Sequence, residues 1–86
     1  MPTKMTMNGL RVYFKTNGSN PRSDEDVFYS RRGNGPYYRW LYEAKDAQWR
    51  VSRVISADFT PQSLSMASWK AVPLTLQARL GEHYLE

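Results

Sequence analysis

The sequence contains no cysteine, and this absence removes several kinds of chemistry together. Disulfide bonds, thiolate metal sites and cysteine nucleophiles are excluded from the 86 residues. A chain without cysteine fits a reducing compartment, so we expect a cytoplasmic protein. No stretch approaches the run of about eighteen apolar residues that a membrane-spanning helix needs. Residues 1–8 lack the apolar core of a signal peptide, and we expect them to form a flexible N-terminal segment.

Histidine is almost absent as well, which argues against acid–base and metal chemistry. The single histidine, His83, lies near the end of the sequence, where chains fray unless they are tied down. Glu82, His83 and Glu86 match no known metal-ligand spacing, and the acidic run 24–26 lacks the glycine and distal glutamate of a calcium loop. We therefore predict no metal, no cofactor and no enzymatic activity.

The sequence does provide enough large apolar side chains for one compact core. Hydrophobic residues make up 41% of the chain, and three Trp, six Tyr and three Phe supply much of the apolar area. A chain of this composition is not disordered, and its length corresponds to one domain. We predict a single domain over residues 9–86.

Four segments have the pattern of β-strands. Apolar and polar residues alternate over 10–15, and residues 27–32, 37–42 and 49–55 are rich in strand-forming types. Residues 19–26 contain Asn, Pro and an acidic run, which is typical of a solvated loop. The expected product is an antiparallel meander of three or four strands.

The glycines after the second segment predict a tight hairpin. Asn34-Gly35 supplies the positive φ angles of a two-residue turn, which would place Gly33 opposite Pro36. Tyr29 would then face Trp40 on the next strand.

The following hairpin would place Tyr42 opposite Trp49. One face of the sheet would then collect an aromatic cluster made of Val27, Tyr29, Tyr38, Trp40, Tyr42, Trp49 and Val51. The other face would collect Phe28, Ser30, Tyr37, Arg39, Leu41, Arg50, Ser52 and Val54. A slip of one residue would exchange the two sets, so the assignment depends on the turns.

The last third of the chain has helical signals. Thr60-Pro61 resembles a helix start, and the apolar residues over 64–69 would follow it. Pro73 can open a second helix, in which apolar residues recur every four positions and which Gly81 would end. The overall expectation is an α+β fold: the meander, followed by one or two C-terminal helices packed on its aromatic face.

Basic and aromatic residues share the predicted sheet, which favours a nucleic-acid-binding function. The net charge is +4, and nine of the twelve Lys and Arg residues lie between Arg11 and Arg53. Cations that track phosphates and rings that stack on bases are typical of surfaces that bind single strands. Small sheets also carry Arg and Tyr because these side chains pack their stems and keep their polar tips in water. The same residues could therefore serve structure alone and bind no nucleic acid. The candidate residues are Arg31, Arg32, Arg39, Arg50 and Arg53, with Tyr37 for stacking.

A protein-interaction role is the alternative. The predicted turns leave several apolar side chains on the face that the helices do not cover, and such a patch marks a partner site or a homodimer. Its residues are Phe28, Tyr37, Leu41 and Val54.

Overall fold

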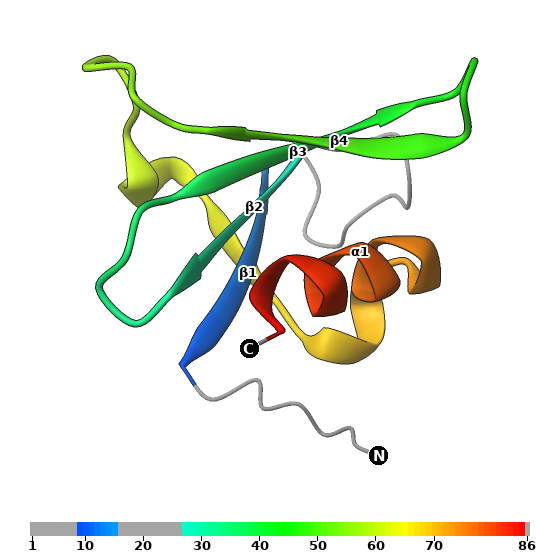
Figure 1. Cartoon of the computed structure of the whole chain (residues 1–86). Coiled ribbons are helices and arrows are strands. Elements are labelled where there is room, and N and C mark those ends of the chain that lie inside the picture. The colour runs from blue at the N-terminus through cyan, green and yellow to red at the C-terminus, as the bar shows by residue number, and fades with distance from the viewer. Residues whose placement is uncertain (1–8, 16–26, 86) are drawn as a thin grey trace.

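The protein has an α+β fold, a five-stranded antiparallel sheet with a C-terminal helix on one face (Figure 1). The computed structural model describes residues 9–15 and 27–85. The expected N-terminal segment 1–8, the whole of the expected loop 19–26 and Glu86 lie outside the described residues. The described elements are β1 (Leu10–Lys15), β2 (Val27–Arg32), β3 (Tyr38–Glu43), β4 (Gln48–Arg53), η2 (Pro61–Ser63), β5 (Ser65–Ala67), η3 (Trp69–Ala71) and α1 (Leu74–Tyr84).

The strands follow the order β4-β3-β2-β1-β5 across the sheet, and every described neighbour pair is antiparallel. The first four strands form the meander that the sequence predicts. The chain then crosses from the β4 edge to the β1 edge, where the short β5 adds a fifth strand. Figure 1 shows α1 packed against the sheet on the side away from the segment that follows β4. Among the described residues, no helix is long and apolar enough to cross a membrane.

The β3–β4 hairpin has the predicted register. Tyr42 lies opposite Trp49 and Trp40 lies opposite Val51. Ala47, in the turn between the strands, adopts a positive φ of 52°. Because side chains alternate along a strand, this register places Arg39 and Arg50 together on the other face.

The β2–β3 register differs from the prediction by one residue. Phe28, and not Tyr29, lies opposite Trp40. The turn runs from Arg32 to Gly35, whose N–H donates to the Arg32 carbonyl at 3.0 Å, and Gly33 takes the positive φ of 58°. The loop is therefore one residue longer than an Asn-Gly turn.

This shift exchanges the faces of β2. Phe28 and Ser30, expected on the exposed face, are fully buried beneath the helix, and Tyr29 lies on the opposite side. The expectation that α1 covers the aromatic face is confirmed for Trp40 and Trp49, which belong to the same buried cluster as the helix residues. This core consists of Val12, Phe14, Phe28, Trp40, Trp49, Ala67, Val72, Leu76 and Leu80.

The helical prediction is half correct. Pro73 precedes α1 as its N-cap, and Leu76 and Leu80 bury one face of it with Tyr84 packed alongside. Gly81 lies inside this helix and does not end it. The helix expected after Thr60-Pro61 is wrong, because that segment forms a three-residue 3₁₀ turn and then β5. Without β5, β1 would be an edge strand whose outer backbone groups bond only to water. The pairing of β5 with β1 satisfies these groups, and this gain outweighs the local helical pattern.

Candidate nucleic-acid interface

The sheet face turned away from α1, here called the open face, carries the polar and basic half of each strand. Val12, Phe14, Phe28, Trp40 and Trp49 point into the core, so their strand neighbours point the other way. The cross-strand pairs on this face are Arg11 with Arg31, Tyr13 with Tyr29, Tyr29 with Arg39, Arg39 with Ser52 and Leu41 with Arg50.

Residues 54–64 fold back over part of the open face. The backbone N–H of Val54 donates to the Tyr37 carbonyl at 2.9 Å and fixes the start of this segment. Phe59 stacks on Tyr29 with ring centroids 5.2 Å apart and meets Tyr37 edge-on at 5.1 Å. Tyr13 extends the ring cluster to Tyr37 at 6.1 Å. Phe59 is not among the residues predicted for the site, and its only signal in the sequence is that it is an isolated aromatic residue in a polar stretch.

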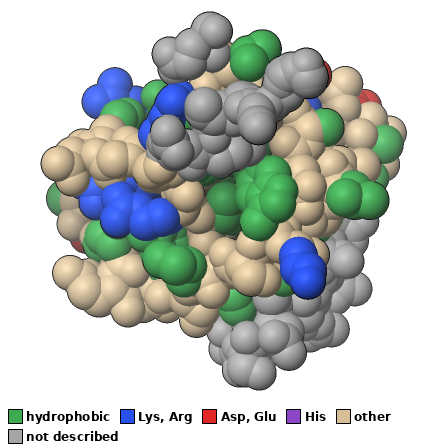
Figure 2. Space-filling view, turned by 90° about the horizontal axis from the view of Figure 1, so that it is seen from below, with side chains coloured by type: hydrophobic (Ala, Val, Ile, Leu, Met, Phe, Trp, Pro, Cys, Tyr) green, Lys and Arg blue, Asp and Glu red, His purple; other side chains and the backbone are tan. Residues whose placement is uncertain are grey.

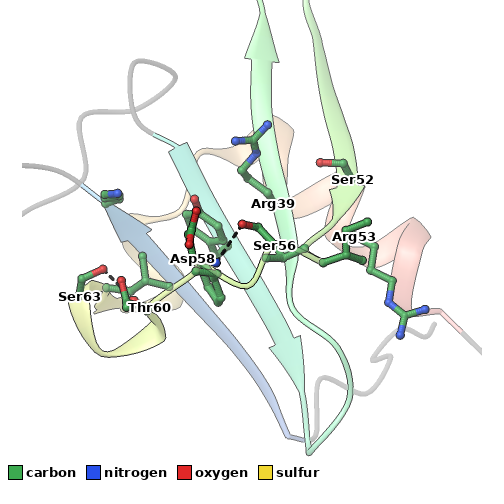
Figure 3. A pocket seen from close by; sticks show the side chains of 13 residues that line it. Arg39, Ser52, Arg53, Ser56, Asp58, Thr60 and Ser63 are labelled. Carbon is green, nitrogen blue, oxygen red and sulfur yellow. Dashed lines mark hydrogen bonds between the residues drawn. The ribbon is translucent and has the colours of Figure 1, made fainter.

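A pocket of about 380 Å³ lies between this segment and the strands (Figure 3). Strand residues Lys15, Tyr29, Arg39 and Ser52 line one part of it. The rest is lined by the end of β4 and the returning segment, namely Arg53, Val54, Ile55, Ser56, Asp58, Phe59, Thr60, Ser63 and Leu64. Figure 3 shows Arg39 and Ser52 on adjacent strands above Ser56, while the Arg53 side chain extends away from them. Three cations, four serine or threonine hydroxyls and one carboxylate thus line a single cavity.

Arg39 is the candidate residue best placed to meet a ligand. Its side chain is exposed on β3, and within the described residues it makes no hydrogen bond or ion pair. Lys15, at the end of β1, is likewise exposed and without an ion pair in that part of the chain. An unpaired surface cation has no competing anion to lose when a phosphate approaches.

Arg50 lies on the same face but is already engaged. Its guanidinium contacts Glu43 and Asp46, each at 2.6 Å, in exposed ion pairs. The hydrogen bond to Glu43, followed by that to Asp46, raises the pKa of Arg50 above its usual value. Its positive charge is permanent, yet two carboxylates balance it locally.

Arg31 is held by the β2–β3 loop. Its Nε donates to the Gly35 carbonyl at 2.9 Å, and its guanidinium lies 4.7 Å from the centre of the Tyr37 ring. Nη1 also donates to the Tyr37 hydroxyl at 3.3 Å. Arg31 and Phe59 therefore both contact the ring of Tyr37, which limits its value as a stacking platform.

The other two candidate arginines do not join this group. Arg32 donates to the Tyr84 carbonyl at 2.9 Å, next to the end of α1. Arg53 pairs with Tyr38, which packs against the core, and so belongs to the helix side of β4. Of the predicted set, the fold therefore brings Arg31, Tyr37, Arg39 and Arg50 to one face.

The apolar patch predicted for a protein partner does not assemble as expected. Phe28 is 0% exposed and belongs to the core, because the β2–β3 register is shifted. Tyr37 is half-buried among other rings, and Val54 lines the pocket. Leu41 alone remains an exposed large side chain of that set, at 39%.

His83 lies apart from the open face. Its ring contacts Tyr38 and Tyr84 at 4.6 and 4.7 Å between centroids, and burial followed by the charge of Arg79 lowers its pKa below the usual value of 6.5. Burial likewise raises the pKa of Tyr84. Within the described ranges, no three Asp, Glu or His side chains come together where they could hold a metal ion.

The face of the molecule seen from below in Figure 2 mixes positive charge with apolar side chains. In the view of Figure 2, Lys and Arg lie among hydrophobic residues, and acidic side chains are visible only at the rim. Comparisons of the chain with family models, with curated proteins and with solved structures found no match. The chemistry of the open face is therefore the guide to function.

Proposed function

We propose that this protein is a binding module, not an enzyme, and that its open face binds single-stranded nucleic acid. The observation that carries the proposal is Arg39, an exposed cation without an ion pair in the described chain, in the lining of a pocket that Tyr29 and Phe59 also line. Surfaces that bind single strands combine cations for the backbone with ring faces for the bases. Lys15 supplies a second such cation on the same face.

A single strand suits this surface better than a duplex. Reading a duplex usually requires a helix or a β-ribbon inserted into the major groove. The only arginine on α1, Arg79, pairs with Glu82 at 3.0 Å and packs over Trp40. The basic residues instead lie across a sheet, where separated bases can reach them.

A salt series of fluorescence-anisotropy titrations tests this proposal, using labelled single-stranded and duplex oligonucleotides. We expect the single strand to bind more tightly, with an affinity that weakens as salt rises. Each phosphate neutralised contributes a slope of about −0.7 in log K against log salt for single strands. Failure of both oligonucleotides to bind at low salt would rule the proposal out.

The variant Arg39→Glu locates the surface. It should abolish most of the binding, because it replaces the unpaired cation by a repelling carboxylate. Lys70→Glu is the matched control, since Lys70 is exposed in η3 and does not line the pocket. Equal losses in the two variants would indicate non-specific attraction to the net charge and not a site at Arg39.

A protein-interaction role remains the alternative function. It is favoured by large apolar side chains that stay exposed, with Leu41 on the open face and Ile55 at 86% exposure in the returning segment. Sedimentation over a wide concentration range tests the homodimer form of this proposal. A dimer that Leu41→Ser or Ile55→Ser dissociates would support it, and a monomer throughout would contradict it.

A further inference from the structure

The pocket on the open face is richer in donors than binding to a continuous strand requires. Charge, hydrogen-bonding groups and shape all converge on one small cavity of about 380 Å³. We infer that this pocket binds a phosphate monoester, the phosphorylated end of a nucleic-acid strand. The inference rests on the proposed function and adds to it a preference for one kind of strand end.

The first argument is charge. Lys15 and Arg39 are the two cations whose side chains lie on this face of the pocket, and Asp58 is the only carboxylate in its lining, whereas the side chain of Arg53 extends away (Figure 3). An internal phosphodiester carries one negative charge, whereas a phosphate monoester carries about −1.5 to −2 at neutral pH. A monoester therefore supplies nearly one negative charge for each of Lys15 and Arg39, whereas a diester supplies one for the two.

The second argument is the supply of hydrogen-bond donors. Ser56 Oγ accepts the Asp58 backbone N–H at 3.1 Å, which leaves its own proton for a ligand. Ser52 lies beside Arg39 on the next strand and also lines the cavity (Figure 3). A monoester offers three acceptor oxygens, and charge-assisted bonds from arginine, lysine and hydroxyls are the strong class of hydrogen bond.

The third argument is shape. A volume of about 380 Å³ lies at the small end of the range of about 300–1,000 Å³ for small-molecule sites, so it fits one unit of a chain. The segment 54–64 closes one side of the cavity, and Phe59 fixes that segment by stacking on Tyr29. A strand passing through would have to leave across this wall, whereas a strand that ends in the pocket would not.

The deciding experiment compares three oligonucleotides of one sequence, each labelled internally. One carries a 5′-phosphate, one a 3′-phosphate, and one has hydroxyls at both ends. We expect a terminal phosphate to tighten binding about tenfold over the hydroxyl form. Inorganic phosphate and a free nucleoside monophosphate serve as competitors, and they distinguish recognition of the phosphate alone from recognition of a strand end.

Two variants link the preference to the pocket. Arg39→Gln should remove most of the preference for a phosphorylated end. Asp58→Asn is nearly isosteric and removes the one carboxylate, so it should strengthen binding of the phosphorylated strand several-fold. Lys45→Gln is the control, because Lys45 is exposed outside the pocket and should leave the preference unchanged. Circular dichroism of each variant verifies that it is folded.

The outcomes separate the two proposals. Equal affinity for all three oligonucleotides would overturn the inference about strand ends and leave single-strand binding intact. Absence of binding to any of them would overturn both. If the preference for a phosphorylated end persists in Arg39→Gln and does not change in Asp58→Asn, the phosphate binds elsewhere and the assignment to this pocket is overturned. A preference for the phosphorylated end that is lost in Arg39→Gln and increased in Asp58→Asn supports the assignment to this pocket.

Discussion

The indole Nε1 of Trp40 donates a hydrogen bond of 2.9 Å to Oγ of Ser30 on the neighbouring strand. Ser30 is completely buried, and its Oγ also lies 2.7 Å from the Tyr84 hydroxyl at the end of α1. One serine thus joins β2, β3 and the helix through groups that would otherwise be buried without partners. Polar groups in a core are tolerated when they are satisfied in this way.

Replacing Ser30 by Ala is expected to destabilise the protein. The change leaves the indole N–H of Trp40 without its buried acceptor, and such a group costs about 1–3 kcal/mol. We expect a loss of that size in the free energy of unfolding, measured by urea denaturation. Tryptophan fluorescence, to which the buried Trp40 and Trp49 contribute, follows the same transition.

Tyr84→Phe is the matched control, because it removes only the hydroxyl at the other end of this network. It leaves the Trp40–Ser30 bond in place and should cost about 0.5–1.5 kcal/mol, less than Ser30→Ala. A Ser30→Ala protein as stable as the parent would show that this network contributes little.

The position of Ser30 also shows what the sequence can and cannot predict. The β3–β4 register agrees with the prediction, because pairing Tyr42 with Trp49 places two aromatic residues opposite each other across the loop. The β2–β3 register does not, because Gly33 and the Asn34-Gly35 pair each offer a turn. The structure uses a positive φ at Gly33, and this one-residue difference moves Phe28 and Ser30 into the core.

Long-range contacts account for the remaining differences. Residues 64–69 have apolar spacing that suits a short helix, but β1 has a free edge that only a distant segment can pair. The placement of Arg39 and Arg50 on one face was predictable from strand alternation. The pocket was not, because it depends on Phe59 returning to stack on Tyr29, thirty positions earlier in the sequence.

Gly81 offers a stabilising substitution. It lies inside α1, it does not have a positive φ, and a Cβ added there would meet nothing within 4 Å. Gly81→Ala should therefore raise the free energy of unfolding by about 0.5–1 kcal/mol, because alanine loses less backbone entropy in a helix. Thermal unfolding followed by circular dichroism measures the gain.

Gly33→Ala provides the contrast. A Cβ added at Gly33 would also meet open space, but the φ of 58° at this residue is left-handed. Alanine in that conformation should cost about 1 kcal/mol or more. If both substitutions shift the unfolding temperature in the same direction, backbone conformation does not govern the stability of the β2–β3 turn.

His83 should give the protein a pH-dependent stability near neutrality. Burial, followed by the nearby charge of Arg79, lowers the pKa of His83 in the folded chain below 6.5. Between that lowered pKa and 6.5 the unfolded chain binds more protons, so stability rises with pH. We expect the full stability above about pH 6.5 and a progressive loss as the pH falls below it.

Urea denaturation at pH 7.5, 6.5 and 5.5 measures this effect. His83 is the only histidine, and carboxylates titrate at lower pH, so one side chain dominates the interval. His83→Gln should flatten the dependence, and Arg79→Gln should reduce it by removing the repelling charge. A slope that persists in His83→Gln would assign the effect to another group.

Arg39 and Arg50 should contribute unequally to nucleic-acid binding although they lie on adjacent strands of one face. Arg50 is bound by Glu43 and Asp46, each at 2.6 Å, while Arg39 has no ion pair among the described residues. A phosphate that binds Arg50 must displace or face two carboxylates. Arg39→Gln should therefore weaken single-strand binding several-fold, and Arg50→Gln should change it less than twofold.

The double variant Glu43→Gln/Asp46→Asn tests this explanation directly, since it frees Arg50 without altering any arginine. Binding should strengthen, and the salt slope should steepen by about 0.7 if one more phosphate is then neutralised. Glu82→Gln frees Arg79 on α1, outside the open face, and should leave the slope unchanged. If freeing Arg79 strengthens binding as much as freeing Arg50, net charge and not the open face controls the interaction. If only Arg50 responds, the two carboxylates restrict the nucleic-acid surface to the part of the sheet around Arg39.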